Sequence, residues 1–87
     1  MTRDEARQIA SDYLRQRGRD VRIRQVLLWD EITFRKPAPY FTSPVRPEDC
    51  WVCYLEPQVV MLASSEIVLV ARETGEVVYA GSASDEG

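Results

Sequence analysis

The sequence predicts an α+β fold in which an N-terminal helix packs on one face of an antiparallel sheet of about four strands. Two observations lead to this fold class. The chain opens with apolar residues at helical spacing, and from residue 21 onward the apolar period changes to two. Because 87 residues is the length of one small domain, we expect residues 1–87 to form a single domain.

The predicted helix covers residues 3–17. Thr2 and Glu5 have the spacing of a capping box, which places the start of the helix. Gly18 stands where a left-handed residue commonly ends a helix. One side of this helix is apolar, because the following residues recur every three or four positions: Ala6, Ile9, Ala10, Tyr13 and Leu14.

Four strands are predicted, at residues 21–35, 50–56, 66–72 and 76–81. We expect a bulge or turn in the first of them near Asp30 and Glu31. Gly75 is expected to be the left-handed residue of the turn that joins the last two strands. Strict alternation in the first strand predicts one face made by Val21, Ile23, Gln25, Leu27 and Trp29, and the opposite face made by Val26, Leu28, Ile32 and Phe34.

The remaining segments are predicted to lack regular structure. Residues 36–49 hold four of the five prolines, which cannot donate to a strand ladder, and are expected to form a long loop. Residues 58–65 are compatible with a loop, a helical turn or an extension of a strand. Residues 82–87 are small, polar and acidic, as in a frayed tail.

The predicted strands are apolar on both faces. Trp51, Cys53 and Leu55 alternate with Cys50, Val52 and Tyr54, and the next strand repeats this pattern. A two-layer domain usually leaves one sheet face to water, and one helix cannot cover both. We therefore expect the second face to be covered by the Pro-rich loop, by a second copy of the chain or by a partner protein.

The residue types present argue against catalysis. The chain has no histidine to activate a serine and no Gly-rich phosphate loop. Cys50 and Cys53 spell C-x-x-C, but on a strand an offset of three points the two thiols to opposite faces, and buried core thiols are the favoured interpretation. We expect a protein that is not an enzyme and has no catalytic residues, no metal site and no cofactor.

The charge is unevenly distributed along the chain. Residues 1–24 contain seven arginines and four acids, whereas residues 25–87 contain four basic residues and ten acids. The cluster Arg15, Arg17, Arg19, Arg22 and Arg24 suggests phosphate contacts, but Asp12 and Asp20 interleave and the net charge is −3. We treat nucleic-acid binding through residues 15–24 as a less favoured alternative.

The features that favour a protein partner are aromatic, aliphatic and acidic. Tyr40 and Phe41 lie on the stiff Pro-rich loop, where docking costs little entropy. The predicted contact residues are Tyr40, Phe41, Trp51, Val60 and Met61, with Glu48, Asp49, Asp85 and Glu86 steering a basic partner. The alternative is that the same face is buried in a homodimer.

The organisation resembles the immunity protein 35 family, small bacterial domains of toxin systems. The resemblance rests on the opening helix at residues 4–14, the aromatic strand at residues 50–56, and the stretch from Ile67 to Val77 with its Glu-Thr-Gly-Glu-Val hairpin. That hairpin is also similar to those of PepSY-like and cystatin-like meanders. The resemblance implies a cytoplasmic protein that binds and blocks a toxin.

The reducing cytoplasm is also the expected location on the residues themselves. The chain has only two cysteines, and no apolar leader follows Met1. Its apolar runs are also far shorter than a membrane span, and all three observations favour the cytoplasm. We therefore expect no membrane association.

Overall fold

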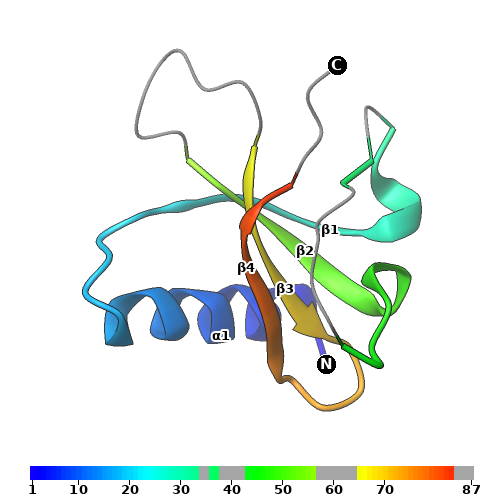
Figure 1. Ribbon diagram of the computed structural model, residues 1–87, viewed down its shortest axis with the longest axis horizontal. Coiled ribbons are helices and arrows are strands. Elements are labelled where there is room, and N and C mark those ends of the chain that lie inside the picture. Colours follow the sequence, from blue (N-terminus) through cyan, green and yellow to red (C-terminus); the bar gives the residue numbers. More distant parts are fainter. Residues whose placement is uncertain (34–35, 38–42, 57–64, 84–87) are drawn as a thin grey trace.

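The structure, a computed structural model, describes residues 1–33, 36–37, 43–56 and 65–83. It has one helix and a four-stranded antiparallel sheet in the order β1-β2-β3-β4, which confirms the predicted α+β class. The helix α1 contacts all four strands (Figure 1). The helix and strands of the chain are α1 (Arg3–Gln16), β1 (Ile23–Leu28), β2 (Cys50–Leu55), β3 (Glu66–Ala71) and β4 (Val77–Ser82).

The ends of α1 follow the local sequence signals. The Glu5 amide donates to the Thr2 hydroxyl over 3.2 Å, and the Glu5 carboxylate accepts from the Thr2 amide at 2.8 Å, which completes the capping box. At the other end Gly18 has a φ of 71°. The Arg19 amide donates to the Leu14 carbonyl at 2.9 Å, and the Gly18 amide donates to the Arg15 carbonyl at 3.0 Å. These two bonds are those of a Schellman motif, so α1 ends one residue earlier than predicted.

The first strand is shorter than predicted. β1 ends at Leu28, and a 3₁₀ turn, η1 (Trp29–Glu31), follows it where the turn near Asp30 and Glu31 was expected. The Glu31 carboxylate accepts the Leu28 amide at 2.8 Å, which closes this turn. Lys36 lies against this turn, because its Nζ donates to the carbonyl oxygens of Trp29 and Ile32 at 2.7 and 3.2 Å. Phe34 and Arg35 lie outside the described residues.

A bulge in β1 overturns the predicted assignment of its faces. Ile23 pairs with Leu55 but Gln25 pairs with Tyr54, so Arg24 is an extra residue in the ladder. The extra residue places Ile23 on the same side as Val26, in the cluster that contacts α1. Strict alternation had put these two residues on opposite faces.

The other segments differ from prediction at their ends. The predicted loop 36–49 ends in a 3₁₀ turn, η2 (Pro47–Asp49), directly before β2. Gly75 has the expected left-handed φ of 75°. The predicted tail begins too early, because Ser82 belongs to β4, and Ala83 is fully buried and donates its amide to the Ser65 carbonyl at 2.8 Å. Residues 57–64 and 84–87 lie outside the described residues.

Both faces of the sheet are buried within this one chain. On the side of α1, the core contains Ala6, Ala10, Leu14, Val26, Trp51, Cys53, Val68 and Val70. On the other side Val52, Ile67 and Leu69 are 0% exposed. They pack with Ile32 and Ala83 and with the half-buried Trp29 and Val45. The described parts of the flanking segments therefore contribute to the cover of this second face, with Val45 the residue that the predicted Pro-rich loop supplies among the described residues.

Candidate functional site

The structure places three of the nine predicted contact residues. Trp51 is 7% exposed and belongs to the core beneath α1, so the prediction that it contacts a partner is wrong. Alternation along β2 puts its side chain on the helix side, together with Cys53 and Leu55. Six predicted contact residues lie outside the described residues: Tyr40, Phe41, Val60, Met61, Asp85 and Glu86.

Glu48 and Asp49 lie in η2. The Glu48 carboxylate forms an ion pair with Arg46, with Oε2 and Nη2 2.8 Å apart. Asp49 is exposed, and its backbone carbonyl accepts the Arg72 amide at 3.1 Å. The Glu48 carboxylate is therefore paired with a basic side chain, whereas the bond at Asp49 involves only the backbone.

The two cysteines are free thiols on opposite sides of the sheet, as their spacing predicted. Burial is the main cause that raises the pKa of Cys50 to about 11, and nearby Asp49 and Glu48 raise it further. Burial also raises the pKa of Cys53 to about 12. A high pKa disfavours the thiolate, which is the form that attacks electrophiles and binds metals. Within the ranges the structure covers, no three Cys, His, Asp or Glu residues are grouped as metal ligands.

We expect both thiols to resist alkylation in the folded protein. At pH 8 iodoacetamide should modify Cys50 and Cys53 at least about a hundredfold more slowly than in urea, since each pKa unit lowers the thiolate fraction about tenfold and burial blocks access. Mass spectrometry over time measures the two rates. Rapid modification of either thiol in the native protein would contradict the assignment of both to the core.

The outer edge of β1 is closed by side chains. The Arg22 carbonyl accepts the Glu56 amide at 2.8 Å, so by alternation the Ile23 carbonyl points away from β2. The Arg7 guanidinium donates to that outward carbonyl at 2.7 Å. With the Leu28 amide bound to Glu31, both ends of this edge are occupied. Such caps discourage the pairing of β1 with another strand.

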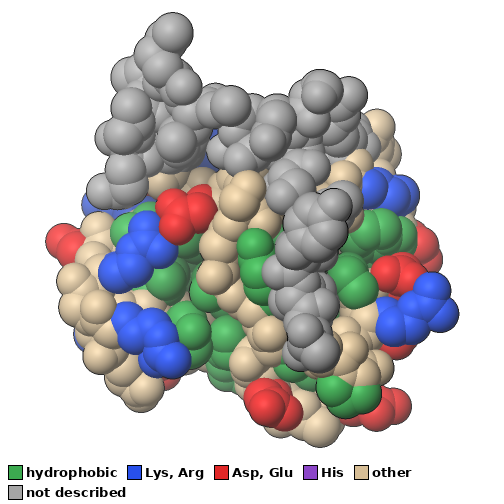
Figure 2. Space-filling view, in the orientation of Figure 1, with side chains coloured by type: hydrophobic (Ala, Val, Ile, Leu, Met, Phe, Trp, Pro, Cys, Tyr) green, Lys and Arg blue, Asp and Glu red, His purple; other side chains and the backbone are tan. Residues whose placement is uncertain are grey.

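Basic side chains gather where α1 ends and the chain turns toward β1, at the left of Figure 2. There an open hollow of about 550 Å³ lies between α1 and the segment that leads into β1. We call it the arginine hollow. Four arginines and one acid line it among the described residues, together with small and apolar ones; these lining residues are Arg7, Ser11, Arg15, Gly18, Arg19, Asp20, Val21, Arg22 and Ile23.

The four arginines of the hollow have different partners. Arg7 is held by the neutral Ile23 carbonyl and so keeps its charge available. Arg15 lies 3.5 Å from the Asp12 carboxylate in an exposed ion pair. Arg19 makes a two-pronged contact with the Glu66 carboxylate at 2.7 and 3.2 Å. Arg22 is exposed and forms an ion pair with no carboxylate of the described residues.

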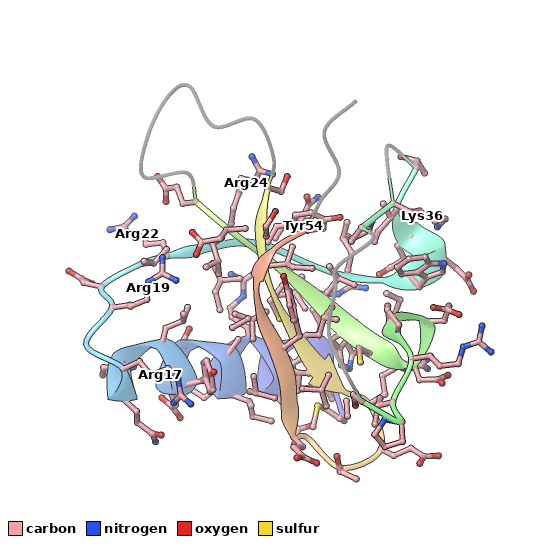
Figure 3. All side chains as sticks on the ribbon, in the orientation of Figure 1. Arg17, Arg19, Arg22, Arg24, Lys36 and Tyr54 are labelled. Atoms are coloured by element: carbon pink, nitrogen blue, oxygen red, sulfur yellow. The ribbon has the colours of Figure 1, made fainter. Side chains whose placement is uncertain are left out.

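The structure brings together only part of the arginine cluster noted in the sequence. Arg15, Arg19 and Arg22 line the hollow, whereas Arg17 stacks on the Tyr13 ring at 3.9 Å. Figure 3 shows Arg17, Arg19 and Arg22 at the left of the molecule and Arg24 apart from them, nearer the top centre. Arg7 was not predicted from the sequence to join this cluster, although Arg7, Ser11 and Arg15 are spaced four residues apart and so share one side of a helix.

The arginine hollow suits oxyanions. A guanidinium group offers a planar fork of donors that matches a carboxylate or a phosphate, and it is charged at every physiological pH. Because the hollow is open and cationic, an acidic side chain can enter it without first displacing buried groups. Among the described residues that line it, none is a nucleophile paired with a base.

Comparisons of the chain with family models, with curated proteins and with solved structures find no match. No helix in the described part of the chain is long and apolar enough to cross a membrane.

Proposed function

We propose that this chain is a non-catalytic protein-binding domain and that its contact site is the arginine hollow, which binds an acidic segment of the partner. The observation that carries the proposal is the convergence of Arg7 and Arg15 from α1 and of Arg19 and Arg22 from the segment before β1 on one open hollow, with one acid among its described lining residues. This reverses the charge expected for the partner. The sequence had suggested a basic one, steered by acids of which only Glu48 and Asp49 are described.

Two further features support recognition rather than catalysis. The chain lacks histidine, and the burial that raises the pKa values of Cys50 and Cys53 suppresses their nucleophilic form. The resemblance to the immunity protein 35 family would make the partner a toxin and the compartment the cytoplasm.

Nucleic acid is the second candidate ligand, because phosphates also bind to arginine clusters. A protein partner is favoured because a long polyanion would also have to pass Asp12, Asp20 and Glu66, which lie at or beside the hollow, whereas a single acidic side chain need not. The net charge of −3 also repels a long polyanion, whereas a short acidic segment can be steered to one cationic end of the molecule.

The substitution Arg22→Glu tests the proposal. We expect the dissociation constant for a fluorescein-labelled polyglutamate peptide, measured by fluorescence anisotropy, to rise about tenfold or more, because a carboxylate then faces the incoming acid. Arg72→Glu is the matched control, since Arg72 is exposed, changes the net charge equally and lies outside the hollow, at the turn between β3 and β4.

Equal weakening by both substitutions would show that the peptide responds to net charge and not to the hollow, and would contradict the proposal. Tighter binding of a labelled oligothymidine than of polyglutamate, with the same loss in Arg22→Glu, would replace the acidic protein segment by a nucleic acid.

A further inference from the structure

We propose that Glu66 is an internal counter-ion of the arginine hollow, and that an acidic partner binds by displacing the Glu66 carboxylate from Arg19. This inference rests on the proposed function and concerns the regulation of the same site. It predicts that the free protein holds its hollow in a partly neutralised state, so that only a partner presenting a competing carboxylate gains the full interaction.

The geometry of the pair is that of a bound carboxylate ligand. Arg19 Nη1 lies 2.7 Å from Glu66 Oε2, and Arg19 Nη2 lies 3.2 Å from Oε1, so both prongs of the guanidinium are occupied. The side chains of Arg19 and Glu66 are 38% and 32% exposed, respectively. The pair is thus shielded enough to be specific and open enough for exchange with a carboxylate from solution.

Glu66 reaches Arg19 from a different part of the fold. It is the first residue of β3, and alternation places its side chain on the same side as Val68 and Val70, which belong to the core beneath α1. Arg19 belongs to the segment between α1 and β1. Arg19 lines the hollow whereas Glu66 does not, so the ion pair directs the Arg19 guanidinium toward β3.

The backbone of Arg19 is positioned without Glu66. The Schellman motif holds it through the bond from the Arg19 amide to the Leu14 carbonyl at 2.9 Å, and Gly18 supplies the left-handed residue that this motif requires. Removing the Glu66 charge therefore releases the Arg19 side chain while the segment keeps its course. A contact that served only to fasten this segment would duplicate what the motif already does.

The other arginines of the hollow are neutralised less. The partner of Arg7 is an uncharged carbonyl, and Asp12 approaches Arg15 only to 3.5 Å in an exposed pair. Glu66 is thus the carboxylate with which a ligand must compete most directly. Because it is tethered to the same chain, its effective concentration is high, and it reduces the apparent affinity of the hollow by the fraction of time that it occupies Arg19.

The test is the substitution Glu66→Gln, which keeps the size of the side chain and removes its charge. We expect the dissociation constant for the labelled polyglutamate peptide to fall about three- to tenfold relative to the wild type. Glu48→Gln is the matched control, because it also removes one carboxylate from an arginine, Arg46, and that pair lies outside the hollow. The control should change the constant by less than about twofold.

A double substitution separates displacement from a general change of charge. In an Arg19→Ala background, Glu66→Gln should no longer tighten binding, since the arginine that it releases is absent. Urea unfolding of each variant checks that all of them fold.

Unchanged or weaker binding by Glu66→Gln, or equal tightening by Glu48→Gln, would overturn the inference, while wild-type binding that Arg22→Glu weakens more than Arg72→Glu upholds the proposed function. Failure of the wild type and of Glu66→Gln alike to bind the peptide would overturn both.

Discussion

Replacing Leu69 with alanine is expected to lower the free energy of unfolding by about 2–5 kcal/mol. Leu69 is 0% exposed at the centre of the sheet face that lies away from α1, among Val52, Tyr54 and Ile67. Truncation there removes buried apolar surface and leaves a cavity that close-packed neighbours fill only in part. Urea unfolding followed by circular dichroism measures the loss.

Leu27→Ala is the matched control for Leu69→Ala. Leu27 packs against the same cluster but is half-buried on the edge strand, so the same truncation should cost clearly less. A loss below about 1 kcal/mol for Leu69→Ala would show that this face is not a true core.

The dependence of unfolding on protein concentration distinguishes a face covered within the chain from one buried in a homodimer. If the chain covers its own second face, the urea midpoint of the wild type should not change when the concentration is raised about a hundredfold. A midpoint that rises with concentration would support the homodimer alternative.

Replacing Trp51 with alanine is expected to cost about 3–5 kcal/mol of unfolding free energy. The indole is 7% exposed between β2 and α1, with the Arg3 guanidinium 5.4 Å from its ring centre. Trp29→Ala is the control, because Trp29 is the other tryptophan and is only half-buried in η1. Urea unfolding compares the two variants, and a smaller loss for Trp51→Ala than for Trp29→Ala would contradict the place assigned to Trp51 in the core.

Trp51→Phe separates the ring from its polar group. The Trp51 indole nitrogen is buried and has no hydrogen-bond partner among the described residues. Phenylalanine keeps most of the ring contacts and removes this unpaired donor, so we expect it to cost much less than alanine. A loss as large as that of Trp51→Ala would show that the indole nitrogen makes a bond that matters.

The helix was the element most fully predictable from the sequence, because its start, its apolar side and its end depend on residues that are close in the chain. Thr2, Glu5 and Gly18 act within one turn of the backbone that they cap. The strands were recognised by their branched and aromatic residues, but their ends were not. The end of β1 depends on where Glu31 bonds, and the end of β4 depends on the pairing of Ala83 with Ser65.

The candidate site was only partly predictable. Arginines from residues 15–24 were visible as a cluster, but a strand or loop sends successive side chains in different directions, so the sequence did not show which of them converge. Arg7 lines the hollow from α1, whereas Arg17 does not line it and lies over the Tyr13 ring instead. Trp51 was misplaced for a related reason, since an aromatic residue on a strand suits a core and a contact surface equally.

The sequence by itself determined the fold class and the excess of apolar side chains on both sides of the sheet. Both depend on local hydrogen bonding and on the period of apolar residues, which are set by residues close together in the chain. Tertiary structure alone decided what covers the second face and which charges meet. A single extra residue, Arg24, moves Ile23 to the face of Val26, and Glu66 reaches Arg19 across 47 positions of the chain. Such long-range contacts depend on how strands pair and on the crossing of α1 over the sheet, and neither is encoded in any one segment.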